Sequence, residues 1–177
     1  MTISMYAALV PPLLESLGNL RYLLEKAEQH ASSHGYDSSV LLQSRLYPDM
    51  FDLTRQVQVA TDIARRGAAR LAQMEAPAVE DKETSIAELI ARIDHTLAYL
   101  QQLPEAAFEG SEQRSVSLPL PAAYGGGEMV FEGWPYLSGF VLPNVYFHVT
   151  TSYALLRHNG VPLGKRDFLM GAKTPPT

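Results

Sequence analysis

Apolar residues recur every three or four positions over most of the chain, a spacing that places them on one face of an α-helix. The first such stretch predicts a helix over residues 5–32, and its apolar face carries Val10, Leu13, Leu14, Leu17, Leu20, Leu24 and Ala27. Pro11 and Pro12 must either start this helix or kink it, because proline lacks a backbone donor and crowds the preceding turn. Gly35, directly after His34, supplies a stop signal.

A second helix is expected to begin at Tyr47-Pro48-Asp49, because proline in a first turn followed by an acidic residue favours a helix N-terminus. It follows a short apolar piece at 40–46, and its own apolar face carries Met50, Leu53, Val57, Ala60, Ala64, Ala68 and Leu71. The small alanines on this face permit another helix to approach closely.

A charged connector at 77–84 leads to a third helix, whose start is marked by the capping-box pattern of Ser85 and Glu88. Its apolar face carries Ile86, Leu89, Ile90, Ile93, Leu97 and Leu100, and it ends before Pro104. Between 103 and 140 the helical period is lost, and segments 115–118 and 129–131 predict two short strands of a hairpin or flap. A fourth helix is expected to start near Pro143 and to end before Gly160.

These elements predict an all-α protein: a four-helix bundle with a long crossover loop that carries a short β-hairpin between the third and fourth helices. No internal repeat or second-domain boundary interrupts the pattern, so residues 1–171 are expected to form one domain. Residues 164–167 are interpreted as a short basic turn, and 172–177 as a flexible tail.

Composition and charge narrow the classes of partner. The chain has 177 residues, a formal net charge of −5 and no cysteine. The acidic balance disfavours nucleic acid and anionic membranes, because both require a concentrated basic surface. The absence of cysteine excludes disulfides, thiolate nucleophiles and cysteine-ligated metal sites, and it fits a reducing cytoplasm.

The stretch 133–156 carries no charged residue and is long enough to cross a bilayer. Its prolines and its polar side chains, among them Asn144, His148 and Thr151, favour an interior helix of a soluble bundle instead. The N-terminus has no basic residue before Arg21, so we expect no signal peptide and a mature chain from Met1.

Candidate chemistry lies where polar residues fall on apolar helix faces, since sites in bundles are built from inward-projecting side chains. On the fourth helix Asn144, His148 and Thr151 form one stripe, which predicts an inward-facing His148. On the second helix Gln56 shares the apolar stripe, whereas Gln58 is expected to be exposed. We therefore expect Gln56 to face His148.

Two interpretations of this polar centre are open. In the functional one, His148 ligates a metal or moves a proton, and Asn144 and Gln56 orient water or a substrate carbonyl. In the structural one, His148 is a core histidine that is satisfied by hydrogen bonds to amides. Asparagine and glutamine are weak ligands for zinc or nickel, which favour imidazole and carboxylate.

The other histidines and the aromatic residues are weaker signals. His30 and His34 are four positions apart, but they lie at the end of the first helix, where imidazole suits the helix dipole. His95 is expected on the surface. An aromatic group either lines a small-molecule pocket or dimer face, or packs the loop onto the bundle, and it comprises Trp134, Tyr136, Phe140, Tyr146, Phe147 and Tyr153.

The run LPNVYFHVTTSYALLRHNGVPLGKRDF at 142–168 closely resembles the closing signature of a family of unknown function, DUF1993, and residues 47–50 and 81–84 are similar to its other marks. That family resembles the DinB and YfiT superfamily of four-helix bundles. Many superfamily members hold a divalent metal with one histidine from the second helix and a His-x-x-x-His pair from the last. The matching positions here are Gln56, Asn144 and His148, so two of the three ligands differ. The resemblance therefore implies the fold more strongly than a thiol-transfer or hydrolase activity.

Three hypotheses follow for function. The leading one is a cytoplasmic DinB-like bundle that binds a small molecule without a tightly held metal, in a pocket built from His148, Asn144, Gln56, Tyr47, Asp49, Thr151 and Trp134. The second is a metal-assisted enzyme in which His148 recruits zinc or nickel with help from Asp49, Tyr47 or an amide. The third is a non-catalytic structural or interaction protein. A homodimer is expected by the resemblance, and neither nucleic acid nor membrane is expected as a partner.

Overall fold

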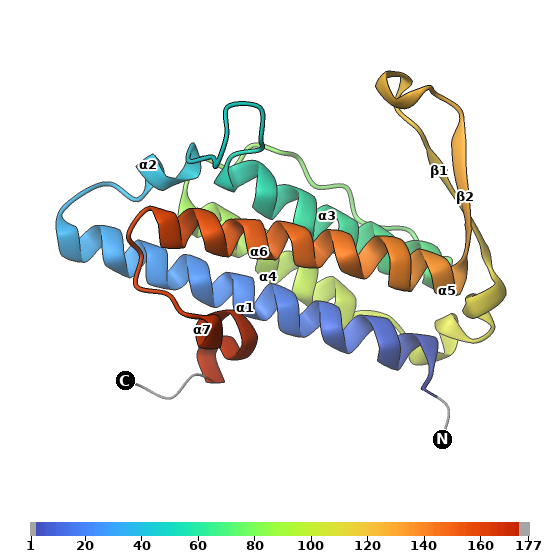
Figure 1. The fold of residues 1–177 in the computed structure, drawn as a ribbon. Coiled ribbons are helices and arrows are strands. Elements are labelled where there is room, and N and C mark those ends of the chain that lie inside the picture. Colours follow the sequence, from blue (N-terminus) through green and yellow to red (C-terminus); the bar gives the residue numbers. More distant parts are fainter. Residues whose placement is uncertain (1–2, 174–177) are drawn as a thin grey trace.

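Helices make up most of the structure, a computed structural model that describes residues 3–173 (Figure 1). Four long helices form a bundle, which confirms the predicted fold class. The helices are α1 (Met5–His34), α2 (Ser39–Leu42), α3 (Leu53–Ala72), α4 (Ile86–Gln102), α5 (Gly133–Pro135), α6 (Leu142–His158) and α7 (Lys165–Met170). The strands are β1 (Ser115–Pro119) and β2 (Glu128–Glu132), and a π-helical segment, Tyr136–Val141, joins α5 to α6. Short 3-10 turns occupy Glu105–Phe108, Ser111–Gln113, Ala122–Tyr124 and Gly171–Lys173.

The first helix, α1, is a single long element although it contains two prolines. Ser4 caps its start by accepting a hydrogen bond from Ala7 N (3.1 Å), and Gly35 ends it with a φ of 70°. Pro11 and Pro12 lie in the second turn of α1, so they do not start the helix, and the helix continues past them to His34. Each proline lacks the N–H that would bond to the carbonyl four residues earlier, so two carbonyls of the first turn lose their usual donors.

The helix α3, which was predicted as the second helix of the bundle, begins later than the sequence predicts. Asp52 caps α3 by accepting a hydrogen bond from Arg55 N (2.9 Å), so the helix starts at Leu53. The preceding residues form a turn instead, in which Met50 N donates to Tyr47 O (3.0 Å). The predicted start was wrong because a side-chain cap one turn later favours the helix more than a first-turn proline does.

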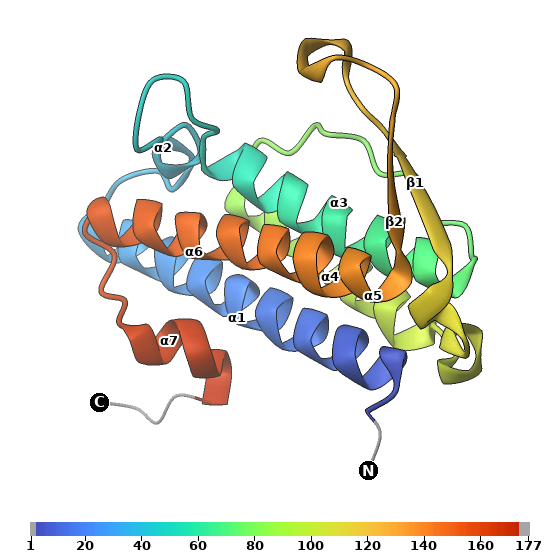
Figure 2. The same ribbon diagram turned by 45° about the vertical axis from the view of Figure 1, so that its right-hand side comes forward.

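The segment between α3 and α4, residues 73–85, runs back along the bundle and is called the return linker here (Figures 1 and 2). Its Glu75 carbonyl accepts a hydrogen bond from Tyr99 near the end of α4 (3.2 Å), while its Asp81 pairs with Arg55 near the start of α3. Ser85 then caps α4, as the capping-box pattern predicts. The return linker lets α3 and α4 point in the same direction.

The connection between α4 and α6 carries the expected hairpin. β1 and β2 pair antiparallel, from Ser115 opposite Glu132 to Pro119 opposite Glu128. The hairpin extends away from one end of the bundle (Figures 1 and 2). Alternate side chains of β1, those of Val116 and Leu118, are buried.

One continuous helical stretch runs from Gly133 to His158 and includes the π-helical segment. The α-helix α6 begins at Leu142, with Pro143 in its first turn as predicted. The helical segments before it were not predicted, and the wider π turn accommodates a proline that cannot bond to the carbonyl four residues earlier. Asn144 Nδ2 donates to Phe140 O (2.6 Å) and so satisfies one carbonyl of this segment. None of the helices described is both long and apolar enough to span a membrane.

After α6 the chain turns at Gly160, with a φ of 90°, and α7 packs against α1 (Figure 1). The interpretation of 164–167 as a basic turn was wrong, because Asp167 caps a helix there. Its carboxylate accepts hydrogen bonds from Gly164 N (2.7 Å) and from Lys26 Nζ of α1 (3.1 Å). Of the predicted tail, residues 172 and 173 belong to a 3-10 turn, and 174–177 lie outside the described residues.

The helices α3 and α6 share the most extensive helix contact in the described chain, and small residues make it close. Ala60, Ala64 and Ala68 of α3 are fully buried. A Cβ added to Gly67 would lie 2.8 Å from Cγ1 of Val141, a buried neighbour before α6. The predicted close approach is therefore confirmed, and it positions the polar residues described below.

Substituting Gly67→Ala is expected to lower the free energy of unfolding by about 1–2 kcal/mol, because the new methyl group overpacks a β-branched neighbour. Gly18→Ala is the matched control, since Gly18 lies inside α1 and no atom is within 4 Å of its added Cβ. The control should gain about 0.5–1 kcal/mol from helix propensity. Urea unfolding followed by circular dichroism measures both, and equal effects would contradict the close approach.

Candidate functional site

The polar centre of the bundle is a contact between His148 of α6 and Gln56 of α3. His148 Nδ1 lies 2.7 Å from Gln56 Oε1, and the two residues are 7% and 1% exposed. Gln56 Nε2 in turn donates to Phe51 O (3.2 Å), just before α3 begins. The two side chains thus meet as their positions on the apolar stripes predict.

The hydrogen bonds of Gln56 determine the tautomer of His148. Because Gln56 uses its NH₂ group on a backbone carbonyl, its oxygen faces the ring, and His148 Nδ1 must donate. Nε2 of the neutral ring then carries a lone pair, for which no hydrogen-bond partner is found in the described part of the chain. Burial lowers the pKa of His148, and the charge of Arg55 lowers it further. The site therefore presents a neutral imidazole with a free acceptor nitrogen.

Asn144 and Thr151 lie on the same face of α6 as His148 but bond within their own helix. Asn144 Nδ2 donates to Phe140 O (2.6 Å), and Thr151 Oγ1 donates to Phe147 O (2.8 Å). The Phe147 ring stands edge-on to the imidazole, with 5.2 Å between the ring centres. These side chains shape the surroundings of the imidazole without bonding to it.

Three other residues of the predicted pocket lie on the surface. Tyr47 is 65% exposed, and Asp49 is also exposed in the loop before α3. Trp134 is 52% exposed in α5, about 21 Å from His148 along the helix axis at roughly 1.5 Å per residue. The structure does not bring Trp134 to His148, and no described hydrogen bond joins Tyr47 or Asp49 to the imidazole.

A buried charge network, to which the sequence analysis gave no role, is centred on Arg92 of α4. Arg92 is 4% exposed, and its guanidinium pairs with Asp62 (2.8 Å), Asp81 (2.9 Å) and Glu83 (2.9 Å). Its Nε also donates to Thr61 Oγ1 (2.8 Å). One side chain thus connects α4 to α3 and to the return linker.

Gln58 and Arg65 of α3 belong to the same network. Gln58 was expected to be exposed, which was wrong: it is 5% exposed because its amide donates to Glu83 Oε2 (2.8 Å). Arg65 is 1% exposed and pairs with Asp62 at 2.5 Å. The available signal was an arginine at 92 among the apolar positions of its helix, together with acidic residues in the return linker.

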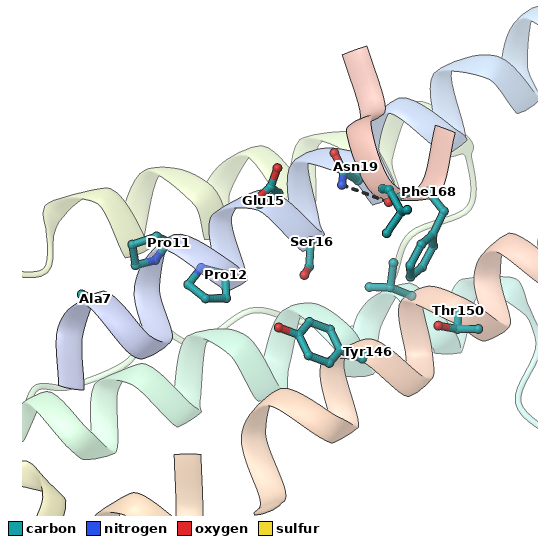
Figure 3. Close-up of a pocket in the computed structure, with 11 residues that line it drawn as sticks. Ala7, Pro11, Pro12, Glu15, Ser16, Asn19, Tyr146, Thr150 and Phe168 are labelled. Atoms are coloured by element: carbon teal, nitrogen blue, oxygen red, sulfur yellow. Dashed lines mark hydrogen bonds between the residues drawn. The ribbon is translucent and has the colours of Figure 1, made fainter. Parts of the chain in front are cut away.

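A cavity of about 730 Å³ lies between α1, α6 and α7 (Figure 3). Tyr146 of the predicted aromatic group lines it, but no residue of the predicted His148 pocket does. Ser16 of α1 and Tyr146 of α6 extend into it from opposite sides. Asn19 Nδ2 donates to Phe168 O (3.0 Å) and so connects α1 to α7 at one end. Among the described hydrogen bonds, none joins a side chain that lines this cavity to the side chains of His148 and Gln56.

A smaller cavity of about 330 Å³ lies between α3, the π-helical segment and β1, and is called the hairpin groove here. Arg55 lines this groove, and the same guanidinium lowers the pKa of His148. The groove and the polar centre are therefore neighbouring parts of the α3–α6 face, although His148 and Gln56 do not line the groove itself.

These features define a four-helix bundle of the DinB type, in which a histidine of the last long helix, α6, faces a glutamine of the second long helix, α3. The chain belongs to the family described as a domain of unknown function (DUF1993), which matches residues 5–169. It is 40% identical to a DinB family member protein from Shewanella denitrificans, whose crystal structure superposes with a TM-score of 0.85 over 97% of this chain and 96% of that one. No curated protein matches the chain. The family resemblance of the closing run is thus confirmed.

The donor set does not fit the three-histidine metal centre of the superfamily. Gln56 Oε1 already accepts from the imidazole, and Asn144 donates its amide N–H to its own helix. Amide oxygens are weak ligands for zinc or nickel, so His148 Nε2 is the one strong donor at these three positions. Among residues 3–173, no group of three or more His, Cys, Asp or Glu side chains is arranged to hold a metal ion.

Substituting Arg92→Met is expected to lower the free energy of unfolding by about 3–5 kcal/mol, because three carboxylates lose their shared cation. Arg21→Met is the control, since Arg21 also bonds two carboxylates, Asp94 and Glu25, but at the surface. It should cost less than about 1 kcal/mol. Urea unfolding at neutral pH measures both variants.

Acidification gives a second readout of the network. Burial raises the pKa of Glu83, but the bonds from Arg92 and Gln58 lower it by more, so the net shift is downward. The stability that Glu83 contributes is present above its ordinary pKa of 4.5 and is lost as the pH falls through the lowered value. The Arg92→Met variant should therefore lose less stability than wild type below that pH, and parallel pH curves would contradict this assignment.

Long-range ¹H–¹⁵N NMR is expected to detect His148 at neutral pH as the neutral tautomer protonated at Nδ1, with a pKa below 6.5. Gln56→Glu should raise that pKa, because a carboxylate at the same position stabilises the imidazolium. A ring protonated at Nε2, or a His148 pKa that does not respond to Gln56→Glu, would contradict the hydrogen-bond assignment.

Proposed function

We propose that this protein binds a small molecule on the α3–α6 face, with His148 as the polar centre and without a tightly held metal. The observation that carries the proposal is the unpaired Nε2 of a largely buried imidazole whose Nδ1 is already engaged by Gln56. Nε2 is not among the fully buried unpaired atoms of residues 3–173, so it is reachable from outside, and a ligand that donates a hydrogen bond to it replaces water at the edge of a largely buried ring.

The partner of the imidazole favours binding over proton transfer. In catalytic histidines a carboxylate commonly orients the ring and stabilises the imidazolium that forms. Gln56 orients the ring in the same way but carries no charge, and the neighbouring Arg55 disfavours the imidazolium further. The neutral ring therefore suits the recognition of a donor group on a ligand more than repeated protonation.

The competing metal-assisted function has His148 Nε2 hold zinc or nickel with help from Asp49, Tyr47 or an amide. Asp49 and Tyr47 are exposed, and no described hydrogen bond joins them to the imidazole, which leaves amides and water as the other ligands. Such a donor set binds divalent transition metals weakly. Metal analysis of protein purified without chelator separates the two functions. We expect less than about one tenth of a metal ion per chain, and one zinc or nickel ion per chain would overturn the metal-free proposal.

A thermal-shift screen of a metabolite panel tests the binding site itself. Compounds that raise the melting temperature of the wild type should lose their effect in His148→Asn, which keeps a polar group of smaller size. His95→Asn is the control, because His95 lies exposed on α4. If every stabilising compound acts equally on His148→Asn and on the control, the proposed role of His148 is incorrect.

A further inference from the structure

The hairpin groove has a polar end that is separate from His148. Arg55 and Arg70 both line it, about 22 Å apart along α3. Tyr136 lies at the Arg70 end, about 18 Å from His148 along the helical stretch that contains both. The volume of about 330 Å³ is within the range of small-molecule sites.

The three arginines of the groove differ in how their charge is balanced. Arg55 pairs with Asp81, and Arg66 pairs with Asp62 (3.1 Å). Arg70 forms no ion pair with any described carboxylate, and its one described side-chain bond goes from Nη1 to the Tyr136 hydroxyl (3.4 Å). The groove therefore contains one uncompensated positive charge, at its Arg70 end.

Tyr136 supplies a second donor at the same place. The residue is 1% exposed, and its hydroxyl oxygen accepts from Arg70, so the hydroxyl hydrogen is free to donate. No acceptor for this hydrogen is found within residues 3–173. Burial raises the pKa of Tyr136 and keeps the hydroxyl protonated. A guanidinium and a hydroxyl thus converge on one point with unused donor capacity.

Asp62 also lines the groove, where its carboxylate is paired with Arg66 and Arg92, and the remaining walls are apolar. The rings of Tyr136 and Phe140 are stacked, with centres 5.6 Å apart and planes 15° apart. Val59 and Ile63 of α3 and Pro119 of β1 also line the groove. This surface favours a flat or extended hydrocarbon body next to the charged end.

We propose that the hairpin groove binds a small apolar monocarboxylate, whose carboxylate bonds to Arg70 and Tyr136 and whose hydrocarbon body packs on Phe140. A single uncompensated cation matches one negative charge, and the planar guanidinium matches a planar carboxylate. An arginine in the last turn of α3 also suits the helix dipole, but that role requires neither the buried hydroxyl nor the groove. The site does not use His148, so it is additional to the proposed function.

Calorimetric titration with 2-naphthoate and with its neutral analogue 2-naphthamide tests this site. Wild type should bind the naphthoate at least about tenfold more tightly than the amide, because the charged hydrogen bonds are lost in the amide. Arg70→Gln should weaken naphthoate binding by about tenfold or more and leave amide binding unchanged. Tyr136→Phe, which keeps the ring, should weaken naphthoate binding by about three- to tenfold.

Arg66→Gln is the matched control, since Arg66 lines the same groove but is paired with Asp62. It should change the naphthoate affinity by less than about threefold. Equal losses in Arg66→Gln and Arg70→Gln, equal affinities for acid and amide, or no naphthoate binding to wild type at about 10 mM would overturn the proposal. If stabilising metabolites act equally on His148→Asn and on its control, the proposed function is incorrect, but the proposed carboxylate site at Arg70 is unaffected.

Discussion

The close approach of α3 and α6 is the constraint on which the rest of the site depends. It requires a small residue at Gly67, where an added methyl group would meet Val141. Further along the same contact, toward the start of α3, the two helices bring Gln56 within hydrogen-bond distance of His148. The amide then determines which ring nitrogen is protonated and leaves the other nitrogen to a ligand.

Charge is arranged around α3 for two different purposes. Arg92 and its three carboxylates hold the return linker against α3 and α4. Arg55 pairs with Asp81, and Arg65 and Arg66 pair with Asp62, so further cations balance these carboxylates. Arg55 connects this network to the site, because it pairs with Asp81 of the linker and also disfavours the charged form of His148. Arg70 lacks such a carboxylate in the described chain, which sets it apart as a group available to a ligand.

The sequence predicts those features that depend on one helix at a time. The apolar stripes place Gln56 and His148 inside the bundle, and the two do meet. Periodicity could not predict that Gln58 is buried, because its partner is Glu83 of the return linker. The start of α6 near Pro143 was predicted, but the helical segment before it was not, because a π turn absorbs a proline that normally stands at a helix start. The homodimer, the small-molecule partner and the cytoplasmic location stay predictions.

The most direct test of this account is a double-mutant cycle between the helices α3 and α6. The free energy of unfolding in urea would be measured for wild type, His148→Ala, Gln56→Ala and the double variant. A direct hydrogen bond predicts a coupling energy of about 1 kcal/mol or more, because each substitution removes the same contact. Additive losses, with a coupling below about 0.3 kcal/mol, would contradict the central claim that Gln56 holds the imidazole of His148.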